Sequence, residues 1–289
     1  MPAETKPQVL ATTGMIADLV RNIASADVQV IQLMGPGVDP HLYKPKPQDL
    51  RNLERAHLIF YNGLHLEGRM VELLENHPRA RSVTRAIPRD KLLFERGQPD
   101  PHVWFDVQLW ISAMETIAED LAAQWPDQAV VFRQRAKSYR AELLGLDEEI
   151  RRAIERIPPE RRVLVTAHDA FRYFGRAYGL EVRGLQGIST ASEASLRELE
   201  ELTELIVRRR IPAVFVESSV PPDAVNRLLE KAQARGQPVR RAPGELFSDA
   251  MGEPGTPEGT YPGMMRHNVR LIVEALAGPR DSTDRPSTP

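Results

Sequence analysis

Four side chains that could bind one metal ion stand out in the sequence: His41, His102, His168 and Asp249. His41 lies in the stretch GPGVDPHLYKPKPQD, where prolines restrict the backbone on both sides of the imidazole. Three neutral imidazole nitrogens and one carboxylate oxygen suit Zn²⁺ or Mn²⁺, whereas Ca²⁺ and Mg²⁺ prefer more oxygen ligands. No pair among the four shows a local spacing motif such as HExxH, so the spacing alone leaves a shared site as a hypothesis.

Each of the four residues also has a purely structural interpretation. His168 could cap the helix that follows it, and His102 could stack beside Trp104. Asp249 could serve only its own glycine-flanked turn, and His41 could be incidental in a stiff surface connection. The residues alone leave the metal site and these structural roles open.

Two further residues could support the site from behind. Glu217 follows an apolar run in VFVESS and could accept a proton from a ligand imidazole, which would fix the orientation of the ring. A salt-bridged or capping carboxylate is the alternative at that position. His65, in YNGLHLEGRM, lies near a predicted strand end and could line the same cleft. The remaining histidines are expected to be structural or solvated: His57, His77 and His267.

Short apolar runs and amphipathic segments alternate along the chain, which favours parallel α/β sheets. The first part predicts a strand and a helix within 8–24, a strand at 28–34, a helix at 47–56, a strand at 57–63, a helix at 66–76 and a short strand near 81–87. A further helix should begin after Asp106, its predicted N-cap. The alternation restarts at 161–167 and continues through 169–180, 181–188, 195–210, 212–219, 222–236, 238–242 and a final helix at 261–278.

These elements place the candidate ligands where α/β proteins bind small molecules. Ligand sites in open α/β sheets lie outside the carboxyl ends of the strands. His41 follows the predicted strand at 28–34, and His168 follows the one at 161–167. A cleft between two lobes would therefore bring candidates from both halves of the chain together.

Residues 126–157 predict one long helix. Its apolar residues recur at intervals of three and four: Phe132, Ala136, Tyr139, Leu143, Leu146, Ile150, Ile154 and Ile157. At 1.5 Å per residue the helix would be about 46 Å long, and it would end at IPPE. An ordinary surface helix and a strut between two lobes both fit this pattern. We expect an N-terminal α/β lobe at 1–126, the connecting helix at 127–157, a C-terminal α/β lobe at 158–278 and a disordered tail at 279–289.

Composition excludes several classes of protein. The 289 residues include 38 basic and 40 acidic ones, so there is no strong net charge to attract nucleic acid. The chain has no cysteine, which excludes disulfides, thiolate metal sites and cysteine nucleophiles. No run of about 18 apolar residues occurs, and the start MPAETKPQ lacks the apolar core of a signal peptide.

Seven ordered motifs resemble one family. They are GPGVDPHLYKPKPQD, YNGLHLE, DPHVWFD, TAHDAFRYFGRAYGL, GLQGISTASEAS, FVESS and GELFSDAMG followed by EGTYPGMMRHN. Together, over roughly residues 8–277, they are similar to the metal-binding solute receptors of ABC importers, the TroA/ZnuA/PsaA family, and most of all to its TroA branch. The resemblance implies two parallel-sheet α/β lobes joined by one long rigid helix, with the metal site in the cleft between them.

The resemblance also implies what binds and where. The family's ligands fall on His41 and His102 in the first lobe and on His168 and Asp249 in the second. Manganese-type relatives often have Glu at the third position, so His168 favours Zn²⁺. The chain lacks the His-rich loop of many zinc receptors, so Mn²⁺ stays open. The implied receptor is exported to the periplasm or the cell surface, with this sequence a trimmed mature form, a monomer that could carry a lipid anchor before trimming. It would deliver the ion to a membrane permease and its ATPase.

Two other functions are considered beside capture and delivery. A zinc hydrolase would use three protein ligands and an open water position, but four donors leave little room for water, and we find no general base comparable to the glutamate of HExxH. An adhesion or scaffolding protein would use the metal only to stabilise its fold. The expected function is a solute receptor and not an enzyme.

Overall fold

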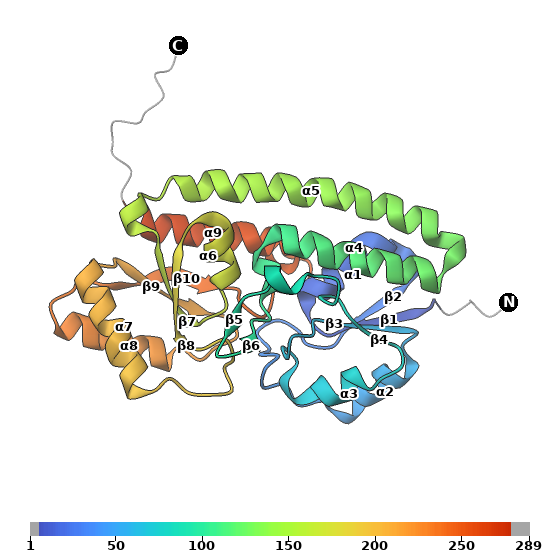
Figure 1. Ribbon diagram of the computed structural model, residues 1–289, viewed down its shortest axis with the longest axis horizontal. Coiled ribbons are helices and arrows are strands. Elements are labelled where there is room, and N and C mark those ends of the chain that lie inside the picture. Colours follow the sequence, from blue (N-terminus) through green and yellow to red (C-terminus); the bar gives the residue numbers. More distant parts are fainter. Residues whose placement is uncertain (1–5, 279–289) are drawn as a thin grey trace, which may run out of the picture.

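The computed structural model describes residues 6–278; the expected tail at 279–289 lies outside the described residues. Two α/β lobes lie side by side along one long helix, α5 (Ala129–Glu155), which runs the length of both (Figure 1). The predicted fold class, two parallel-sheet α/β lobes joined by a long helix, is confirmed. Helix α5 has 27 residues and is therefore about 40 Å long.

The first lobe is built on a four-stranded parallel sheet with the order β2-β1-β3-β4. Its strands are β1 (Gln8–Ala11), β2 (Gln29–Gln32), β3 (Leu58–Tyr61) and β4 (Ala80–Ser82). Its helices are α1 (Gly14–Ala24), α2 (Pro47–Arg55) and α3 (Val71–Glu75). Val9 and Ala11 of β1 pack in the core with α1, whereas Leu10 packs in a separate core with α2 and α3. This alternation covers both faces of the sheet, as parallel sheets require.

The second lobe contains two parallel strand pairs. They are β7 (Val163–His168) with β8 (Glu181–Gln186), and β9 (Ala213–Glu217) with β10 (Arg240–Leu246). Strands β7 and β9 lie next to each other (Figure 1), and their last residues, His168 and Glu217, are hydrogen-bonded, so the carboxyl ends of both lie at the same edge of the lobe. The helices of this lobe are α6 (Arg172–Tyr178), α7 (Leu196–Arg209), α8 (Asp223–Ala234) and α9 (Tyr261–Leu276).

Helix α5 packs against both lobes through the apolar stripe that the sequence predicts. Seven of the eight predicted stripe residues lie within α5 and are buried, and the eighth, Ile157, is buried just beyond its end. A buried hydrogen bond fastens each lobe to this helix. Tyr139 on α5 donates to Asp18 Oδ2 of α1 at 2.6 Å, and Tyr178 of α6 donates to Asp147 Oδ1 on α5 at 2.8 Å.

Helix α4 (Val107–Gln124) begins at the predicted N-cap, because the Asp106 carboxylate accepts from the backbone N–H groups of Gln108 and Leu109. A small antiparallel hairpin that the sequence did not predict, β5 (Phe94–Glu95) with β6 (Gln98–Pro99), lies between the lobes (Figure 1). Short 3-10 helices occur at Ser25–Asp27, Gly68–Met70, Arg89–Lys91, Val103–Phe105, Pro126–Gln128, Pro159–Arg161 and Pro257–Gly259.

Several predicted elements are shorter than expected, among them the following two. The strand near 81–87 is only β4, Ala80–Ser82, because the hydroxyls of Ser82 and Thr84 both donate to the carbonyl of Asn62 and bend the chain away from the sheet. The helix expected at 66–76 is a 3-10 turn followed by the short α3. Gly68, whose φ is +29°, interrupts it, since a right-handed helix needs negative φ.

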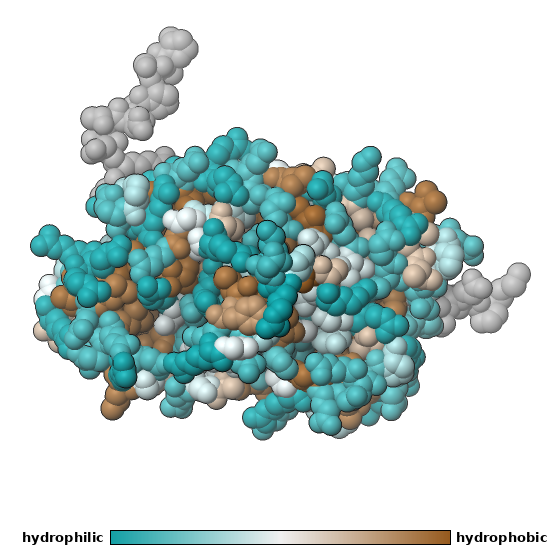
Figure 2. Space-filling view, viewed as in Figure 1, coloured by the Kyte–Doolittle hydropathy of each residue, from teal (hydrophilic) through white to brown (hydrophobic). Residues whose placement is uncertain are grey.

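On the face drawn in Figure 2, hydrophilic residues cover most of the surface and hydrophobic residues form separate patches. Over residues 6–278, no helix combines the length and the apolar character needed to cross a bilayer.

Candidate metal centre

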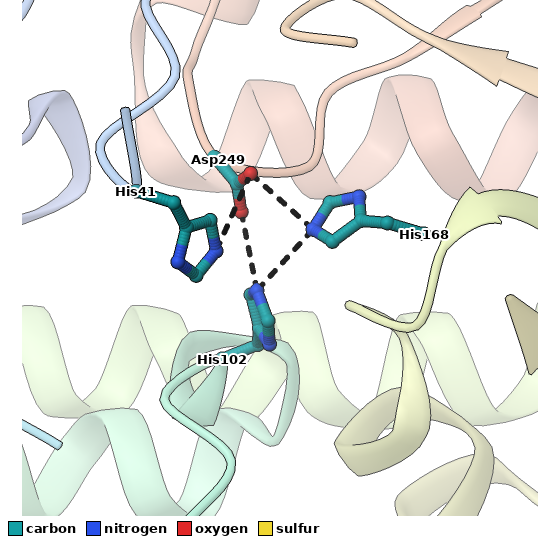
Figure 3. A group of neighbouring side chains, drawn as sticks. All are labelled: His41, His102, His168 and Asp249. Carbon is teal, nitrogen blue, oxygen red and sulfur yellow. Dashed lines mark hydrogen bonds and ion pairs between the residues drawn. The ribbon is translucent and has the colours of Figure 1, made fainter. Parts of the chain in front are cut away.

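The four predicted ligands converge between the lobes (Figure 3). His41 comes from the loop after β2, His102 from the segment before α4, His168 is the last residue of β7, and Asp249 follows β10. Each is at most 5% exposed. One potential ligand atom of each residue lies within 4.8 Å of those of the other three, although the residues are widely separated in sequence.

Ligand atoms of three residues lie at distances close to those around a tetrahedral ion, with the two histidines approaching different oxygens of Asp249. His102 Nε2 lies 3.3 Å from His168 Nε2 and 3.4 Å from Asp249 Oδ1, and His168 Nε2 lies 3.3 Å from Asp249 Oδ2. Zinc–ligand bonds of about 2.0–2.1 Å in a tetrahedron give ligand–ligand edges of about 3.3–3.4 Å. His41 Nε2 stands slightly farther out, 4.0 Å from Asp249 Oδ2.

Polar atoms at this centre are buried without hydrogen-bond partners. Among the described residues, His41 Nε2 and both carboxylate oxygens of Asp249 have none. Buried polar atoms are normally paired, because leaving one unpaired costs its desolvation energy. Unpaired atoms that face a common point are therefore what a cation-binding site would present.

Asp100 orients the ring of His102. Its Oδ1 accepts from the Nδ1–H of His102 at 2.7 Å and from the backbone N–H of the same residue at 3.1 Å. With the proton on Nδ1, the lone pair of Nε2 points to the centre. Trp104 packs edge-on against the His102 ring at 5.3 Å, so the predicted contact with Trp104 exists beside the metal-facing geometry. The Trp104 indole also donates to the carbonyl of Ser248, next to Asp249, at 3.0 Å.

Glu217 has the same relation to His168. It is the last residue of β9, and its two oxygens accept from the Nδ1–H of His168 at 2.5 Å and from the His168 backbone N–H at 2.9 Å. The adjacent ends of β7 and β9 make this contact possible. His168 itself ends a strand, and the next helix begins only at Arg172, so His168 is not the cap of that helix.

His41 is held through its backbone. Its N–H donates to Asp39 Oδ1 at 2.8 Å, and Gly68 packs against its carbonyl so closely that a Cβ on Gly68 would lie 2.2 Å from the oxygen. His65, in the same turn as Gly68, is exposed, and the structure does not bring it into the cluster. The turn instead contacts His41 through Gly68, and its Glu67 accepts from the backbone N–H of Asn62 at 2.6 Å.

The charges of the four residues are coupled. Burial lowers the pKa of His41 to about 3. Burial would also lower the pKa of His102, but its contacts with Asp100 and Asp249 outweigh this and raise it to about 8. Glu217 and Asp249 likewise overcome burial and hold the pKa of His168 well above its usual value. Against its own burial, the same two histidines hold the pKa of Asp249 well below its usual range. The pocket therefore favours positive charge beside Asp249, and a dication would supply it.

A family profile described as ZnuA, the periplasmic component A of a zinc-uptake complex, matches residues 9–275. The chain belongs to this family. The resemblance that the seven motifs indicate is thereby confirmed.

Individual members of the ZnuA family are similar over almost the whole chain. The zinc-binding protein TroA of Treponema pallidum is 51% identical over 279 residues, which cover 95% of this chain and 90% of that protein. The manganese-binding lipoprotein MntA of Bacillus subtilis is 48% identical over 279 residues, 95% of this chain and 91% of MntA. The solved structure of the periplasmic zinc-binding protein TroA of Treponema pallidum aligns with a TM-score of 0.91 over 94% of this chain and 99% of that one.

Two carboxylates of this ZnuA-family chain escaped the sequence analysis, although a signal for both was present. Asp39 and Asp100 each stand two residues before a candidate histidine, in the tripeptide Asp-Pro-His. An aspartate can accept a hydrogen bond from the backbone two residues on, and both do so here. The repeated tripeptide could have identified both as partners of the ligands.

Proposed function

We propose that the chain is an extracytoplasmic receptor that captures Zn²⁺, with Mn²⁺ as the alternative cargo, through His41, His102, His168 and Asp249. The observation that carries this proposal is the spacing of 3.3–3.4 Å among ligand atoms of His102, His168 and Asp249. Each of these distances is close to the edge of a tetrahedron around a zinc-sized ion, and the two histidines approach different oxygens of Asp249. Both oxygens of Asp249 are buried without a hydrogen-bond partner, which also supports a cation at this point.

Zinc is the preferred cargo because of the donor set. Three imidazoles with one carboxylate match tetrahedral zinc, whereas Mn²⁺ favours sites richer in oxygen. The relatives support both ions, since TroA is named as zinc-binding and MntA as manganese-binding at similar identity. Raw affinity will favour Zn²⁺ over Mn²⁺ at almost any such site, so affinity alone does not identify the cargo in the cell.

We infer that the site performs no chemical reaction. A catalytic zinc site keeps one position open for water or substrate, and four protein donors would fill a tetrahedron. Glu217, a carboxylate beside the site, already accepts hydrogen bonds from the ring and the backbone N–H of His168. Hydrolysis of ester or phosphate substrates by the metal-loaded chain would overturn this inference.

The partners follow from the family. PsaA of Streptococcus mitis, 31% identical, is named a substrate-binding lipoprotein of a manganese ABC transporter. By analogy we propose that this receptor works in the periplasm or at the cell surface and delivers its ion to an ABC permease driven by an ATPase. A monomeric state and a lipid anchor stay predictions; sedimentation of the purified chain tests the first, and membrane fractionation of the native protein tests the second.

Elemental analysis tests the proposal directly. The chain, purified without added metal, should carry close to one Zn²⁺ or Mn²⁺ per molecule, and competition between the two ions should then rank them. His168→Ala should lose the bound metal, whereas His65→Asn, which changes an exposed histidine in a left-handed turn, should keep it. A parent chain that binds neither ion, or a His168→Ala variant that binds as tightly as the parent, would refute the proposed site.

A further inference from the structure

One carboxylate in the cleft joins a candidate ligand to the opposite lobe. Asp39 lies two residues before His41, and its Oδ1 accepts from the His41 backbone N–H at 2.8 Å. Its other oxygen, Oδ2, accepts from the hydroxyl of Thr190 at 2.5 Å. Thr190 belongs to the connection between β8 and α7 in the second lobe, so a single side chain links the His41 backbone to the far side of the cleft.

The segment that carries Thr190 is held to the first half of the chain at two points. Besides the Asp39–Thr190 contact, the backbone N–H of Ile188 donates to Glu95 Oε2 of the β5–β6 hairpin at 3.2 Å. Residues 187–190 are half-buried, whereas 191–193 are exposed. The half-buried part of this connection thus lies against the first lobe, and the interlobe hydrogen bond from Thr190 to Asp39 is one of its attachments.

His41 is the candidate ligand whose position depends most on such an attachment. The other two imidazoles each have a carboxylate on Nδ1, and their Nε2 atoms lie 3.3 Å apart. His41 Nε2 lies 4.0 Å from Asp249 Oδ2. Asp39 accepts a hydrogen bond from the backbone N–H of His41 and not from its ring. Gly68 blocks retreat of the His41 carbonyl on one side. The Asp39–Thr190 bond is then a hydrogen bond that ties the His41 loop to the lobe holding His168 and Asp249.

We propose that Asp39 is a positioning residue that couples His41 to closure of the two lobes, and that the interlobe bond with Thr190 slows metal release. This inference rests on the proposed function, because it assumes that His41 binds the ion. When the lobes separate at this edge, Thr190 leaves Asp39 and the His41 loop loses its link to the other donors. The bond exists only with the cleft closed, so its loss should speed dissociation much more than it changes association.

The decisive variants test the hydroxyl of Thr190. Thr190→Val keeps the shape of the side chain and removes the donor, Thr190→Ser restores a hydroxyl, and Ser192→Ala changes an exposed residue of the same segment as a control. Zn²⁺ dissociation from the full-length chain is measured by stopped-flow mixing with excess chromogenic chelator. We expect Thr190→Val to release Zn²⁺ roughly tenfold faster, the size of effect that one hydrogen bond to a carboxylate can have. Thr190→Ser and Ser192→Ala should release it at close to the parental rate.

A second variant guards against an indirect effect of Thr190→Val. Asp39→Ala should release Zn²⁺ at least as fast as Thr190→Val does. The double variant should release it no faster than Asp39→Ala alone, because the Asp39–Thr190 bond is already absent. A Thr190→Val rate equal to the parent's, or an equal increase in Ser192→Ala, would overturn the inference while leaving the proposed function intact. A lower melting temperature of the metal-free chain with an unchanged release rate would assign Thr190 a purely structural role. Failure of the parent to bind Zn²⁺ or Mn²⁺ would instead reject the proposed function itself.

Discussion

Two segments of the cleft carry the same tripeptide and use it differently. In Asp39-Pro40-His41 and in Asp100-Pro101-His102, the aspartate accepts from the backbone N–H of the histidine, at 2.8 Å and 3.1 Å respectively. Asp100 also accepts from the ring of its own histidine, whereas Asp39 turns its second oxygen to Thr190 of the other lobe. The local sequence therefore sets the turn, and the neighbouring residues determine which further hydrogen bond the carboxylate accepts.

The difference suggests a division of labour between the two histidines. His102 has a ring oriented by Asp100, and its Nε2 already lies at tetrahedral distance from two other donors. His41 has no such ring partner among the described residues and stands farther out. We interpret His102 as a fixed ligand and His41 as the ligand that completes the site when the lobes meet.

Removing each histidine tests this division most strongly. We expect His102→Ala to lower Zn²⁺ affinity more than 100-fold, beyond the loss typical of a residue that only supports a ligand. His41→Ala should cost less, because donor atoms of the three residues that remain already lie within 3.3–3.4 Å of one another's nearest donor. Competition titration against a chelator of known affinity measures both, with His65→Asn as the control. Equal losses for the two alanine variants would remove the distinction between fixed and completing ligand.

Substitution of the two aspartates should follow the same order, with a larger loss of Zn²⁺ affinity for Asp100 than for Asp39. Asp100→Asn keeps an acceptor for the His102 ring but removes its charge, and we expect a loss of Zn²⁺ affinity of about 10–100-fold. Asp39→Asn should weaken equilibrium binding less, since Asp39 contacts only the backbone of its histidine. Asp90→Asn, a neutralised exposed carboxylate of the first lobe, serves as the control for net charge. An Asp39→Asn loss as large as that of Asp100→Asn would show that the two tripeptides act alike.

Much of this site could be predicted from the sequence because its ligands follow strand ends. His168 closes β7 and Glu217 closes β9, and both strands are apolar runs whose carboxyl ends are easy to locate. The long helix was predictable for a similar reason, since its buried stripe keeps one period over many turns. Periodicity predicts which face of a helix or strand is buried, and the carboxyl ends of parallel strands predict where a ligand site lies.

The rest depended on contacts between distant segments. The two Asp-Pro-His tripeptides have the same local pattern, so nothing local distinguishes Asp100, which bonds a ring, from Asp39, which bonds Thr190. His65 resembled a cleft residue because it follows a predicted strand, yet it is exposed in a turn where its φ is positive, +64°. Neither the different partners of the two aspartates nor the exposure of His65 can be predicted from spacing or composition.

The indole of Trp104, which contacts the fixed ligand His102, should make a smaller contribution to Zn²⁺ affinity. It donates to the carbonyl of Ser248 at 3.0 Å and so joins the His102 segment to the residue before Asp249. Trp104→Phe keeps an aromatic ring against His102 and removes this bond, and we expect Zn²⁺ affinity to fall about 2- to 10-fold. Trp110→Phe is a matched control, because the buried Nε1 of Trp110 has no hydrogen-bond partner among the described residues. Equal changes in both variants would assign the loss to packing.

Substitution of Asp18 should have the smallest effect on metal binding. It tests whether a buried charge that is not a candidate ligand affects the site. It is a buried carboxylate between α1 and α5 that accepts from Tyr139, with Arg21 and Glu142 as its nearest charged neighbours. Burial raises its pKa from 3.8 to about 6. Between these values the folded chain keeps a proton that the unfolded chain has lost, so this group makes the fold less stable as the pH rises through that window.

Asp18→Asn should remove that dependence. We expect the free energy of unfolding of the variant to exceed that of the parent at pH 7 by on the order of 1–3 kcal/mol, and the difference to shrink as the pH falls toward 4. Urea unfolding of the metal-free chains at several pH values measures this, and the difference between the two chains cancels the other titrating groups. Zn²⁺ affinity at pH 7 should stay within twofold of the parent's, roughly the limit set by a distant, independent site. A large loss of affinity would mean that a buried charge outside the four-residue centre also controls the cleft, and the contrast between the two Asp-Pro-His segments would then lose its meaning.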